Sequence, residues 1–298
     1  MKILDGRVAV ITGAGSGMGA AMARRFGAAG MKIVVSDIDL SAAQSTVATL
    51  AAKGVEAFAV KTDVAESDQV RALADAAYEC YGAVHLLCNN AGVVPAGRHR
   101  LVWETPLEDW TWSNKVNCMG VVHGIHHFVP RMLAQGEEGH VVTTASVAGL
   151  VSSAGSVAYS AAKHAAVRVT EALYAGLLER QAPIGVTLLC PGLVNTRIYE
   201  SERSRPAELL PGAGAAPESP ELQAVADQLY RSAISPDDVA EQVLQAVLSN
   251  QFYVLTTSAF DDAIRDRTQA VLERRNPAFA SLLSLVQRDQ PSSQKERP

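Results

Sequence analysis

Short apolar runs alternate with longer stretches of helical periodicity from residue 8 to about residue 195. The runs are nearly uniformly apolar, as strands covered on both faces should be, and they span residues 8–11, 32–35, 57–60, 86–88, 140–143 and 185–190, with a seventh expected at 252–255. Helices are predicted at residues 20–29, 40–53, 68–81, 107–135, 158–180 and 236–249. Strands that alternate with helices predict an α/β fold, a doubly wound parallel sheet of about seven strands with helices on both faces.

The chain is predicted to divide into a main domain, an extension and a tail. Residues 1–258 form a single domain, in which residues of about 197–222 are a substrate loop. Four prolines and two glycines between residues 201 and 220 break the helical pattern and predict a mobile loop or lid. Residues 259–290 form a helical extension docked on the domain or on a neighbouring subunit. Its apolar residues fall in two groups, Phe260, Ile264, Val271 and Leu272, then Phe279, Leu282, Leu283 and Val286. Residues 291–298 are expected to be disordered.

Charge and composition exclude several classes of function. The chain has 298 residues, with 26 Lys+Arg against 31 Asp+Glu, and no basic run long enough to follow a phosphate backbone, so nucleic acid is not expected as a partner. Residues 8–11 are too short an apolar run for a signal peptide, and no stretch reaches the ~20 apolar residues of a membrane helix. The four cysteines form no CxxC pair, which is typical of a reducing compartment. A soluble cytoplasmic protein without membrane partners is predicted.

A glycine-rich loop connects the first predicted strand to an alanine-rich helix. Residues 12–19 read TGAGSGMG. Glycines permit a tight turn and a close approach of the backbone, so amide N–H groups and the positive end of the helix can face a pyrophosphate. Because the loop follows a strand and precedes a helix, it has the context that a dinucleotide-binding motif requires.

Asp37 ends the second predicted strand, 18 residues beyond Gly19. A carboxylate there can accept both hydroxyls of an adenosine ribose and would repel the additional phosphate of NADP. No Arg or Lys stands at Ala14, Ser16 or Ile38 to compensate a 2′-phosphate. NAD is therefore predicted as the cofactor, with NADP less favoured. The alternative is that Asp37 is an ordinary strand-end residue that caps the next helix.

Tyr159 and Lys163 are four residues apart in the predicted helix 158–180, so they share one helix face. A tyrosine titrates near 10, and acting as a base near pH 7 requires a decrease of ~3 pKa units, or ~4 kcal/mol. A neighbouring cation can favour the phenolate in this way. Taken alone, the pair is better explained as an amphipathic pair at the edge of the core.

Further polar motifs follow the predicted strands in order. Ser146 lies thirteen residues before Tyr159, at the carboxyl end of the sheet, where open α/β folds bind ligands. Residues 89–92 read NNAG, Asn117 lies in the long helix, and residues 191–196 read PGLVNT. As a set, these motifs resemble the short-chain dehydrogenase/reductase family, in its subgroup of roughly 250 residues with TGxxxGxG and YxxxK motifs. The resemblance covers residues 5 to about 200 closely, and the C-terminal extension departs from it.

The resemblance implies a Rossmann-type fold and four catalytic residues. Tyr159 is the general acid/base and Ser146 hydrogen-bonds the substrate oxygen. Lys163 binds the nicotinamide ribose and lowers the tyrosine pKa, and Asn117 helps to hold a water of the proton relay. The implied cofactor contacts are Gly13, Ser16, Gly17, Met18, Gly19, Asp37, Asp63, Val64, Asn90, Tyr159, Lys163, Pro191, Val194 and Thr196. For Asp63, capping of a helix is an equal alternative.

The implied reaction is oxidation of a secondary alcohol with NAD, or the reverse reduction of a ketone. The residues expected around the substrate are Ser146, Val147, Ala148, Tyr159, Leu193, Ile198 and Tyr199. Their mostly apolar character predicts a bulky aromatic or alicyclic substrate. Residues 98–100, Arg-His-Arg, meet a substrate carboxylate or belong to a solvated loop.

Several alternatives accompany this interpretation. They are an NADP-dependent carbonyl reductase, a non-catalytic dinucleotide-sensing protein and a structural component of an oligomer. No metal is predicted, since His123, His126 and His127 share a helix without an acidic third ligand nearby. The resemblance also implies a homodimer or homotetramer assembled through helices 107–135 and 158–180, with a small-molecule alcohol or ketone as the other partner.

Overall fold

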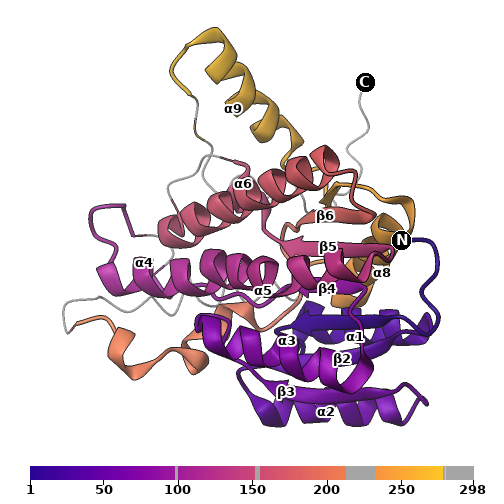
Figure 1. The fold of residues 1–298 in the computed structure, drawn as a ribbon. Coiled ribbons are helices and arrows are strands. Elements are labelled where there is room, and N and C mark those ends of the chain that lie inside the picture. Colours follow the sequence, from indigo (N-terminus) through magenta and orange to yellow (C-terminus); the bar gives the residue numbers. More distant parts are fainter. Residues whose placement is uncertain (98–99, 152–154, 213–231, 278, 280–298) are drawn as a thin grey trace.

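The computed structural model describes residues 1–97, 100–151, 155–212, 232–277 and 279. The strands in these ranges form one parallel sheet of seven strands in the order β3-β2-β1-β4-β5-β6-β7 (Figure 1). Their bounds are β1 Val8–Thr12, β2 Lys32–Asp37, β3 Ala57–Lys61, β4 Leu86–Asn89, β5 Gly139–Thr144, β6 Ile184–Cys190 and β7 Tyr253–Leu255. The predicted Rossmann-type α/β fold is confirmed.

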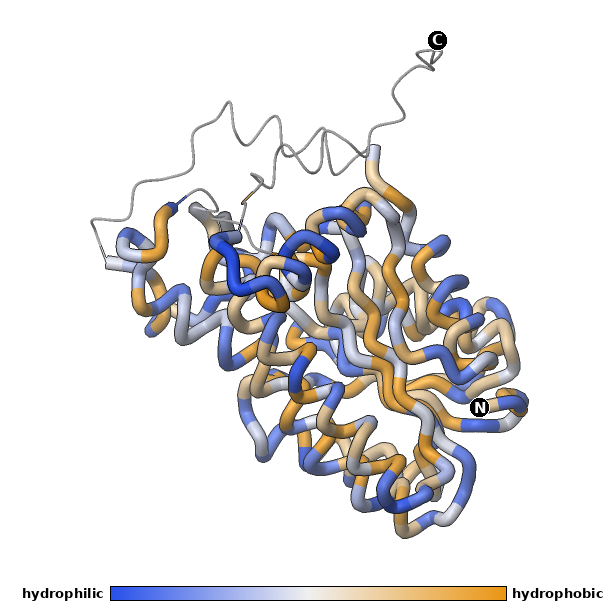
Figure 2. Tube along the Cα trace, turned by 90° about the horizontal axis from the view of Figure 1, so that it is seen from above, coloured by the Kyte–Doolittle hydropathy of each residue, from blue (hydrophilic) through white to orange (hydrophobic). Residues whose placement is uncertain are grey.

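Helices cover both faces of the sheet because alternate residues of each strand point to opposite sides. In β1, Ala9 and Ile11 pack in one core with three of the helices, and Val8 and Val10 pack in a second core on the other face. The first core includes helices α1 (Gly17–Ala28), α2 (Leu40–Ala51) and α8 (Pro236–Ser249). The second includes α3 (Ser67–Tyr81), α4 (Leu107–Asn114), α5 (Gly120–Gln135) and α6 (Val157–Glu179). Figure 2 shows the hydrophobic sheet running through the middle of the molecule, between helices of mixed hydropathy.

The helix predicted at residues 107–135 is not a single α-helix. A π-helical turn, Lys115–Met119, separates α4 from α5. A π-helical turn adds one residue to an α-helix. In a helix as long as 107–135, the apolar residues still recur about every 3.6 positions on average, so their pattern could not reveal the insertion. Such turns are frequent at functional sites. This one contains Asn117, which is fully buried.

The described part of the expected substrate loop contains short helices. Residues Ile198–Ser204 form η3, two short 3₁₀ turns with a kink at Glu200, and Ala207–Leu209 form η4. Local hydrogen bonds stabilise η3, since Nη1 of Arg203 donates to the carbonyls of Arg197 and Glu200. Residues 198–209 of the expected loop therefore contain short 3₁₀ helices, and the mobility of the loop stays a prediction. Proline content suggested a loop there, but it gives no information on these side-chain contacts. Residues 213–222 lie outside the described ranges.

The beginning of the C-terminal extension docks on the domain. Phe260 is 2% exposed and packs with Val147 and Val151, next to helix α9 (Asp261–Glu273). Val271 and Leu272 are exposed, so they are not covered by the domain of the same chain, and their docking on a neighbouring subunit stays a prediction. Phe279 is exposed as well. Leu282, Leu283, Val286 and the tail 291–298 lie outside the described residues.

None of the helices in the described ranges combines the length and the apolar character that crossing a membrane requires. The strand order reverses between β1 and β4, because the chain moves outward from β1 to β3 and then returns to the other side of β1. Open α/β folds bind ligands in the crevice at the carboxyl ends of the strands at such a reversal. The fold therefore directs attention to the loops after β1, β4, β5 and β6.

Candidate active site

A cavity of about 1130 Å³ lies at this point of the fold. Its volume exceeds the ~300–1,000 Å³ of typical ligand pockets, so it has room for a dinucleotide and a second molecule. All fourteen residues predicted to contact the cofactor line it, as do Ser146, Val147, Ala148, Leu193 and Ile198. Two predicted site residues, Asn117 and Tyr199, are not among the lining residues.

The glycine loop after β1 has no room for side chains. A β-carbon built at Gly19 would lie 2.2 Å from the carbonyl oxygen of Gly13, and one built at Gly13 would lie 2.8 Å from Cα of Ala91. Gly13 and Gly17 also have positive φ angles, 64° and 53°, which favour glycine. Helix α1 begins here, and the side chain of its N-cap residue Ser16 makes no capping hydrogen bond. Its first amides therefore suit an anionic ligand such as a pyrophosphate.

Asp37 ends β2 at the edge of the cavity, and backbone amides hold its carboxylate in place. Oδ2 accepts a hydrogen bond from the amide of Gly15 at 2.8 Å, and Oδ1 accepts one from the amide of Asp39 at 3.0 Å. A β-carbon at Gly15 would lie 2.8 Å from Oδ2 of Asp37. Gly15 was not among the predicted cofactor contacts, although its place in the glycine motif was a signal. The fixed carboxylate suits the two hydroxyls of a ribose.

Asp39, not Asp37, caps helix α2. Its side chain accepts hydrogen bonds from the amides of Ala42 and Ser41, and these contacts, with that of the Ser41 hydroxyl, lower the pKa of Asp39. The alternative that Asp37 caps this helix is therefore wrong. The positive charge of Arg203 also contributes to lowering the pKa of Asp39, and Arg203 lines the same cavity. The expectation that no compensating cation lies nearby is therefore wrong, because the fold brings Arg203 to the cavity from a distant part of the sequence.

The end of the cavity near β3 contains an unpaired polar atom. Oγ1 of Thr62 is buried without a hydrogen-bond partner, and Thr62 lines the cavity beside Asp63 and Val64. A buried hydroxyl without a partner fits a polar ligand group such as an adenine edge. The side chain of Asp63 accepts from the amide of Ala65 at 2.9 Å, so it stabilises the turn before α3. Thr62 was not identified from the sequence.

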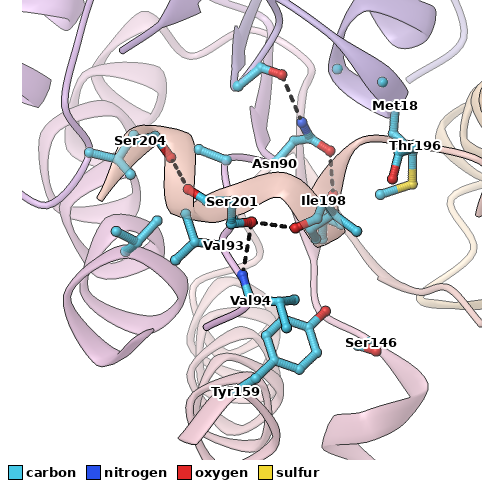
Figure 3. Close-up of a pocket in the computed structure, with 18 of the residues that line it drawn as sticks. Met18, Asn90, Val93, Val94, Ser146, Tyr159, Thr196, Ile198, Ser201 and Ser204 are labelled. Atoms are coloured by element: carbon cyan, nitrogen blue, oxygen red, sulfur yellow. Dashed lines mark hydrogen bonds between the residues drawn. The ribbon is translucent and has the colours of Figure 1, made fainter. Parts of the chain in front are cut away.

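Tyr159 and Ser146 contribute hydroxyl groups to the middle of the cavity. Tyr159 lies in the first turn of α6, and Ser146 precedes the 3₁₀ helix Val147–Gly149 that follows β5. Figure 3 shows both hydroxyls on the same side of the cavity. Oγ of Ser146 accepts from the amide of Ala148 at 3.1 Å and lies 3.5 Å from the carbonyl oxygen of Pro191, which fixes its position.

Lys163 lies behind Tyr159, one turn further along α6. Its side chain is nearly inaccessible, its Nζ donates to the carbonyl of Thr144 at 2.8 Å, and Nζ is 5.7 Å from the centroid of the Tyr159 ring. Burial lowers the pKa of Lys163 to about 8. The predicted shared helix face thus places an ammonium next to the phenol.

Asn117 makes its hydrogen bonds to protein groups. Its Oδ1 accepts from the amide of Val93 at 3.0 Å, and its Nδ2 donates to the carbonyl of Val93 and to Oγ of Ser113, both at 2.9 Å. These contacts connect the π-helical turn to the chain after β4. A β-carbon at Gly92 would lie 3.0 Å from Oδ1 of Asn117 and 3.3 Å from Nζ of Lys163. A glycine at this position keeps the space between these two groups open.

Asn90 connects the ends of three strands. Its Nδ2 donates to the carbonyl of Thr12 at 2.9 Å, and its Oδ1 accepts from the hydroxyl of Thr144 at 3.2 Å (Figure 3). The side chain therefore fixes the loops after β1 and β5 relative to β4. It lines the cavity between the glycine loop and Tyr159.

The other end of the cavity is apolar. Val147 and Leu193 line it together with Phe260, which comes from the C-terminal extension. A β-carbon at Gly192 would lie 3.3 Å from the Phe260 ring, so the extension packs closely on the loop after β6. The sequence analysis placed Phe260 on a docked helix but did not bring it to the site. No signal in the sequence specified that contact.

The basic and histidine clusters have structural partners. Arg100 forms an ion pair with Asp109 at 3.2 Å, while Arg98 and His99 lie outside the described residues. Nδ1 of His123 is 2.9 Å from the carbonyl oxygen of Val64, and Nε2 of His127 is 2.9 Å from the hydroxyl of Ser67. Within the described ranges, no three His, Cys, Asp or Glu side chains are grouped so as to hold a metal ion.

Comparison with known proteins gives consistent matches. A family model described as short chain dehydrogenase matches residues 7–207. The 1-deoxy-11-beta-hydroxypentalenate dehydrogenase of Streptomyces exfoliatus is 37% identical over 267 residues, which cover 89% of this chain and 88% of the relative. The cyclohexanol dehydrogenase of Acinetobacter sp. is 38% identical over 70% of this chain and 81% of its own. A crystal structure of a short chain dehydrogenase/reductase from Burkholderia phymatum in complex with NAD is 44% identical, with a TM-score of 0.86, and the match covers 94% of this chain and 99% of that one.

Proposed function

Because the chain belongs to the short-chain dehydrogenase family, we propose that it is an NAD-dependent oxidoreductase that interconverts a bulky hydrophobic secondary alcohol and its ketone. The observation that carries this proposal is the grouping at the centre of the cavity. The hydroxyls of Tyr159 and Ser146 face the same space, and the buried ammonium of Lys163 lies next to the phenol.

Each residue of this group has a role that follows from its contacts. In the oxidation direction, Tyr159 as phenolate takes the proton from the hydroxyl of the alcohol. Ser146 donates a hydrogen bond to the substrate oxygen, because the contacts that fix its Oγ leave it facing the cavity. Lys163, which is buried, stabilises the phenolate electrostatically. When bound, NAD supplies the acceptor for the hydride that leaves the carbinol carbon. Reduction of a ketone reverses both transfers.

Asn117 acts one step away from the reacting atoms in this proposal. Its side-chain amide hydrogen-bonds the backbone of Val93 and thereby fixes the neighbouring Gly92. Because Gly92 has no β-carbon, the space between Asn117 and Lys163 stays open. A water in that space would pass protons between Lys163 and solvent, so that Tyr159 loses its proton after oxidation and regains one after reduction.

The preference for NAD rests on Asp37. Two backbone amides fix its carboxylate at the end of β2, where it would accept the hydroxyls of the adenosine ribose and repel a 2′-phosphate. Arg203 in the same cavity is the observation that favours the NADP-dependent alternative, because its guanidinium can attract a phosphate. Comparing rates with the two cofactors decides between them.

The substrate class follows from the apolar end of the cavity. Val147, Leu193 and Phe260 present hydrocarbon surface there, which suits a bulky aromatic or alicyclic group. Two relatives are named as dehydrogenases of cyclic alcohols, a hydroxypentalenate and cyclohexanol, which supports the same class for this chain.

We also propose the remaining properties that the sequence analysis predicted. All four cysteines are free, which suits a cytoplasmic location. Helices α4, α5 and α6, on one face of the sheet (Figure 1), suit the assembly of a homodimer or homotetramer. Light scattering of the purified protein would measure the oligomeric state.

The test is a panel of secondary alcohols and ketones with NAD(H) and NADP(H), followed by NADH absorbance. We expect turnover of cyclic or aromatic secondary alcohols with NAD, and loss of at least ~10³-fold in kcat for Tyr159→Phe. Turnover restricted to small polar polyols would exclude the proposed substrate class. More than a few per cent of residual activity in Tyr159→Phe would exclude the proposed mechanism.

A further inference from the structure

Residues 198–209, which we call the roof segment, cover part of the cavity. Ile198, Ser201, Pro206, Glu208 and Leu209 of this segment line it. We propose that Arg205 is a positioning residue that attaches the roof segment to helix α4 and thereby sets the position of the wall against which a bulky substrate packs. This inference rests on the proposed function and specifies how its substrate end is kept in shape.

Arg205 contributes a buried charge at the junction of three chain segments. Its side chain is 1% exposed and that of Asp109 on α4 is 2% exposed, and Nη2 of Arg205 lies 2.6 Å from Oδ1 of Asp109. Nε of Arg205 donates to the carbonyl of Leu209 at 2.7 Å, and Nη1 donates to Glu202 at 3.1 Å. One guanidinium therefore connects Glu202 and Leu209 of the roof segment to α4.

The same guanidinium lies over an aromatic ring that lines the cavity. The central carbon of the Arg205 guanidinium is 4.8 Å from the centroid of the Trp112 ring. Trp112 and Asp109 are three residues apart on α4, so they share a helix face. Stacking and ion pairing together fix the roof segment in distance and in orientation relative to Trp112.

The roof segment is attached to the chain after β4 as well. Oγ of Ser201 accepts from the amide of Val94 at 3.1 Å, as Figure 3 shows, and Oε1 of Glu202 accepts from the amide of Ala96 at 2.8 Å. Because Glu202 also binds Arg205, the chain after β4, the roof segment and α4 form one connected set of contacts. Loss of Arg205 would loosen this set at its centre.

Arginine is required here for a geometric reason. Nε, Nη1 and Nη2 each serve a different acceptor in one plane, which a lysine ammonium cannot reproduce. The carboxylate of Asp109 also accepts from Arg100 at 3.2 Å, and Glu202 keeps its contact with Ala96. Replacement of Arg205 alone therefore leaves each acidic side chain with a remaining partner, which makes Arg205 a better site for substitution than Asp109.

The expected effect falls on substrate binding more than on the chemical step. The guanidinium of Arg205 binds Asp109, Glu202 and Leu209, and Arg205 does not line the cavity. A displaced roof segment would lose contact with the distant part of a large substrate while the reacting groups stay in place. Large substrates should therefore be affected more than small ones.

The experiment compares Arg205→Met and Arg205→Lys with the control Arg24→Met. Arg24 forms an ion pair of the same length, 2.6 Å, with Asp237, which joins α1 to α8 at an exposed position away from the cavity. Kinetics are measured with cyclohexanol and with a bicyclic alcohol such as decahydronaphthol. We expect Arg205→Met to raise KM about tenfold for the bicyclic alcohol and less than about threefold for cyclohexanol, with kcat within about threefold of wild type. Arg205→Lys should lie between wild type and Arg205→Met, and Arg24→Met should match wild type.

Hydrogen exchange provides a readout that does not depend on turnover. In Arg205→Met, the amides of Val94 and Ala96 and those of residues 198–209 should exchange faster, while the sheet and the Arg24→Met control remain unchanged. Unchanged exchange in these segments, or a loss of activity that is equal in kcat and KM for both alcohols, overturns the proposal. If Arg205→Met does not fold, Arg205→Lys decides by the same two measurements. If wild type oxidises no alcohol, the proposed function fails, while hydrogen exchange still decides whether Arg205 attaches the roof segment.

Discussion

The cost of burying Lys163 leads to a prediction that links the site to stability. Burial lowers the pKa of Lys163 in the folded protein to about 8, from an ordinary value of 10.5. Between these two values the unfolded chain binds a proton at this lysine and the folded chain does not. The free energy of unfolding therefore rises with pH across this window, by about 1.4 kcal/mol per pH unit. The total gain from Lys163 is about 3 kcal/mol above pH 10.5. Below pH 8 the contribution of Lys163 to the pH dependence is flat.

Lys163→Met isolates this contribution. The variant removes the buried charge but also leaves the carbonyl of Thr144 without its donor, a cost of ~1–3 kcal/mol. Near pH 7 the two effects oppose each other, so we expect a small net change in stability together with loss of turnover. The informative quantity is the stability difference between wild type and variant, measured by urea unfolding without cofactor at several values from pH 7 to 10.5.

That difference should stay constant below pH 8 and then rise in favour of wild type by about 3 kcal/mol. Subtracting the variant removes the titration of groups that both proteins share, such as Tyr78 and Tyr81, whose pKa values burial raises to about 12. Lys53→Met, at an exposed position, is the matched control for removing a lysine. A difference that is constant over the whole range would refute the reasoning, because Lys163 would then be no harder to protonate in the fold than in the unfolded chain.

Three other substitutions test separate parts of the site. Asp37→Ala should weaken NADH binding about tenfold in a fluorescence titration and reduce discrimination against NADPH. The reason is that the variant removes the ribose acceptor and leaves the amide of Gly15 without its partner. Unchanged NADH affinity would argue against Asp37 as the ribose contact. Gly19→Ala should lower NADH affinity by at least tenfold in the same titration, because the new β-carbon would lie 2.2 Å from the carbonyl oxygen of Gly13. An affinity equal to that of wild type would contradict the geometry of the glycine loop. Phe260→Ala should lower stability by about 3 kcal/mol in urea unfolding and raise KM for cyclohexanol, and an unaffected KM would separate Phe260 from the substrate end.

Features that depend on local patterns were predictable from the sequence. The seven strands were located within a residue or two, because each is a short apolar run between turn residues, and a strand buried on both faces needs such a run. The glycine loop could be recognised because a turn and a close approach of backbones require glycine at fixed offsets. Tyr159 and Lys163 could be placed together because helix geometry brings residues four apart onto one face.

Features that depend on contacts between distant segments were decided by the tertiary structure. The packing of Phe260 on Val147, the proximity of Arg203 to Asp39 and the ion pair of Arg205 with Asp109 all join residues that are far apart in the chain. No spacing rule relates such positions, since packing of the whole core selects which loops meet. The sequence by itself determined the order of the elements and the chemical groups at the strand ends. The shape of the cavity, and the cations and aromatic rings that enclose it, were set only when burial of apolar surface brought these segments together.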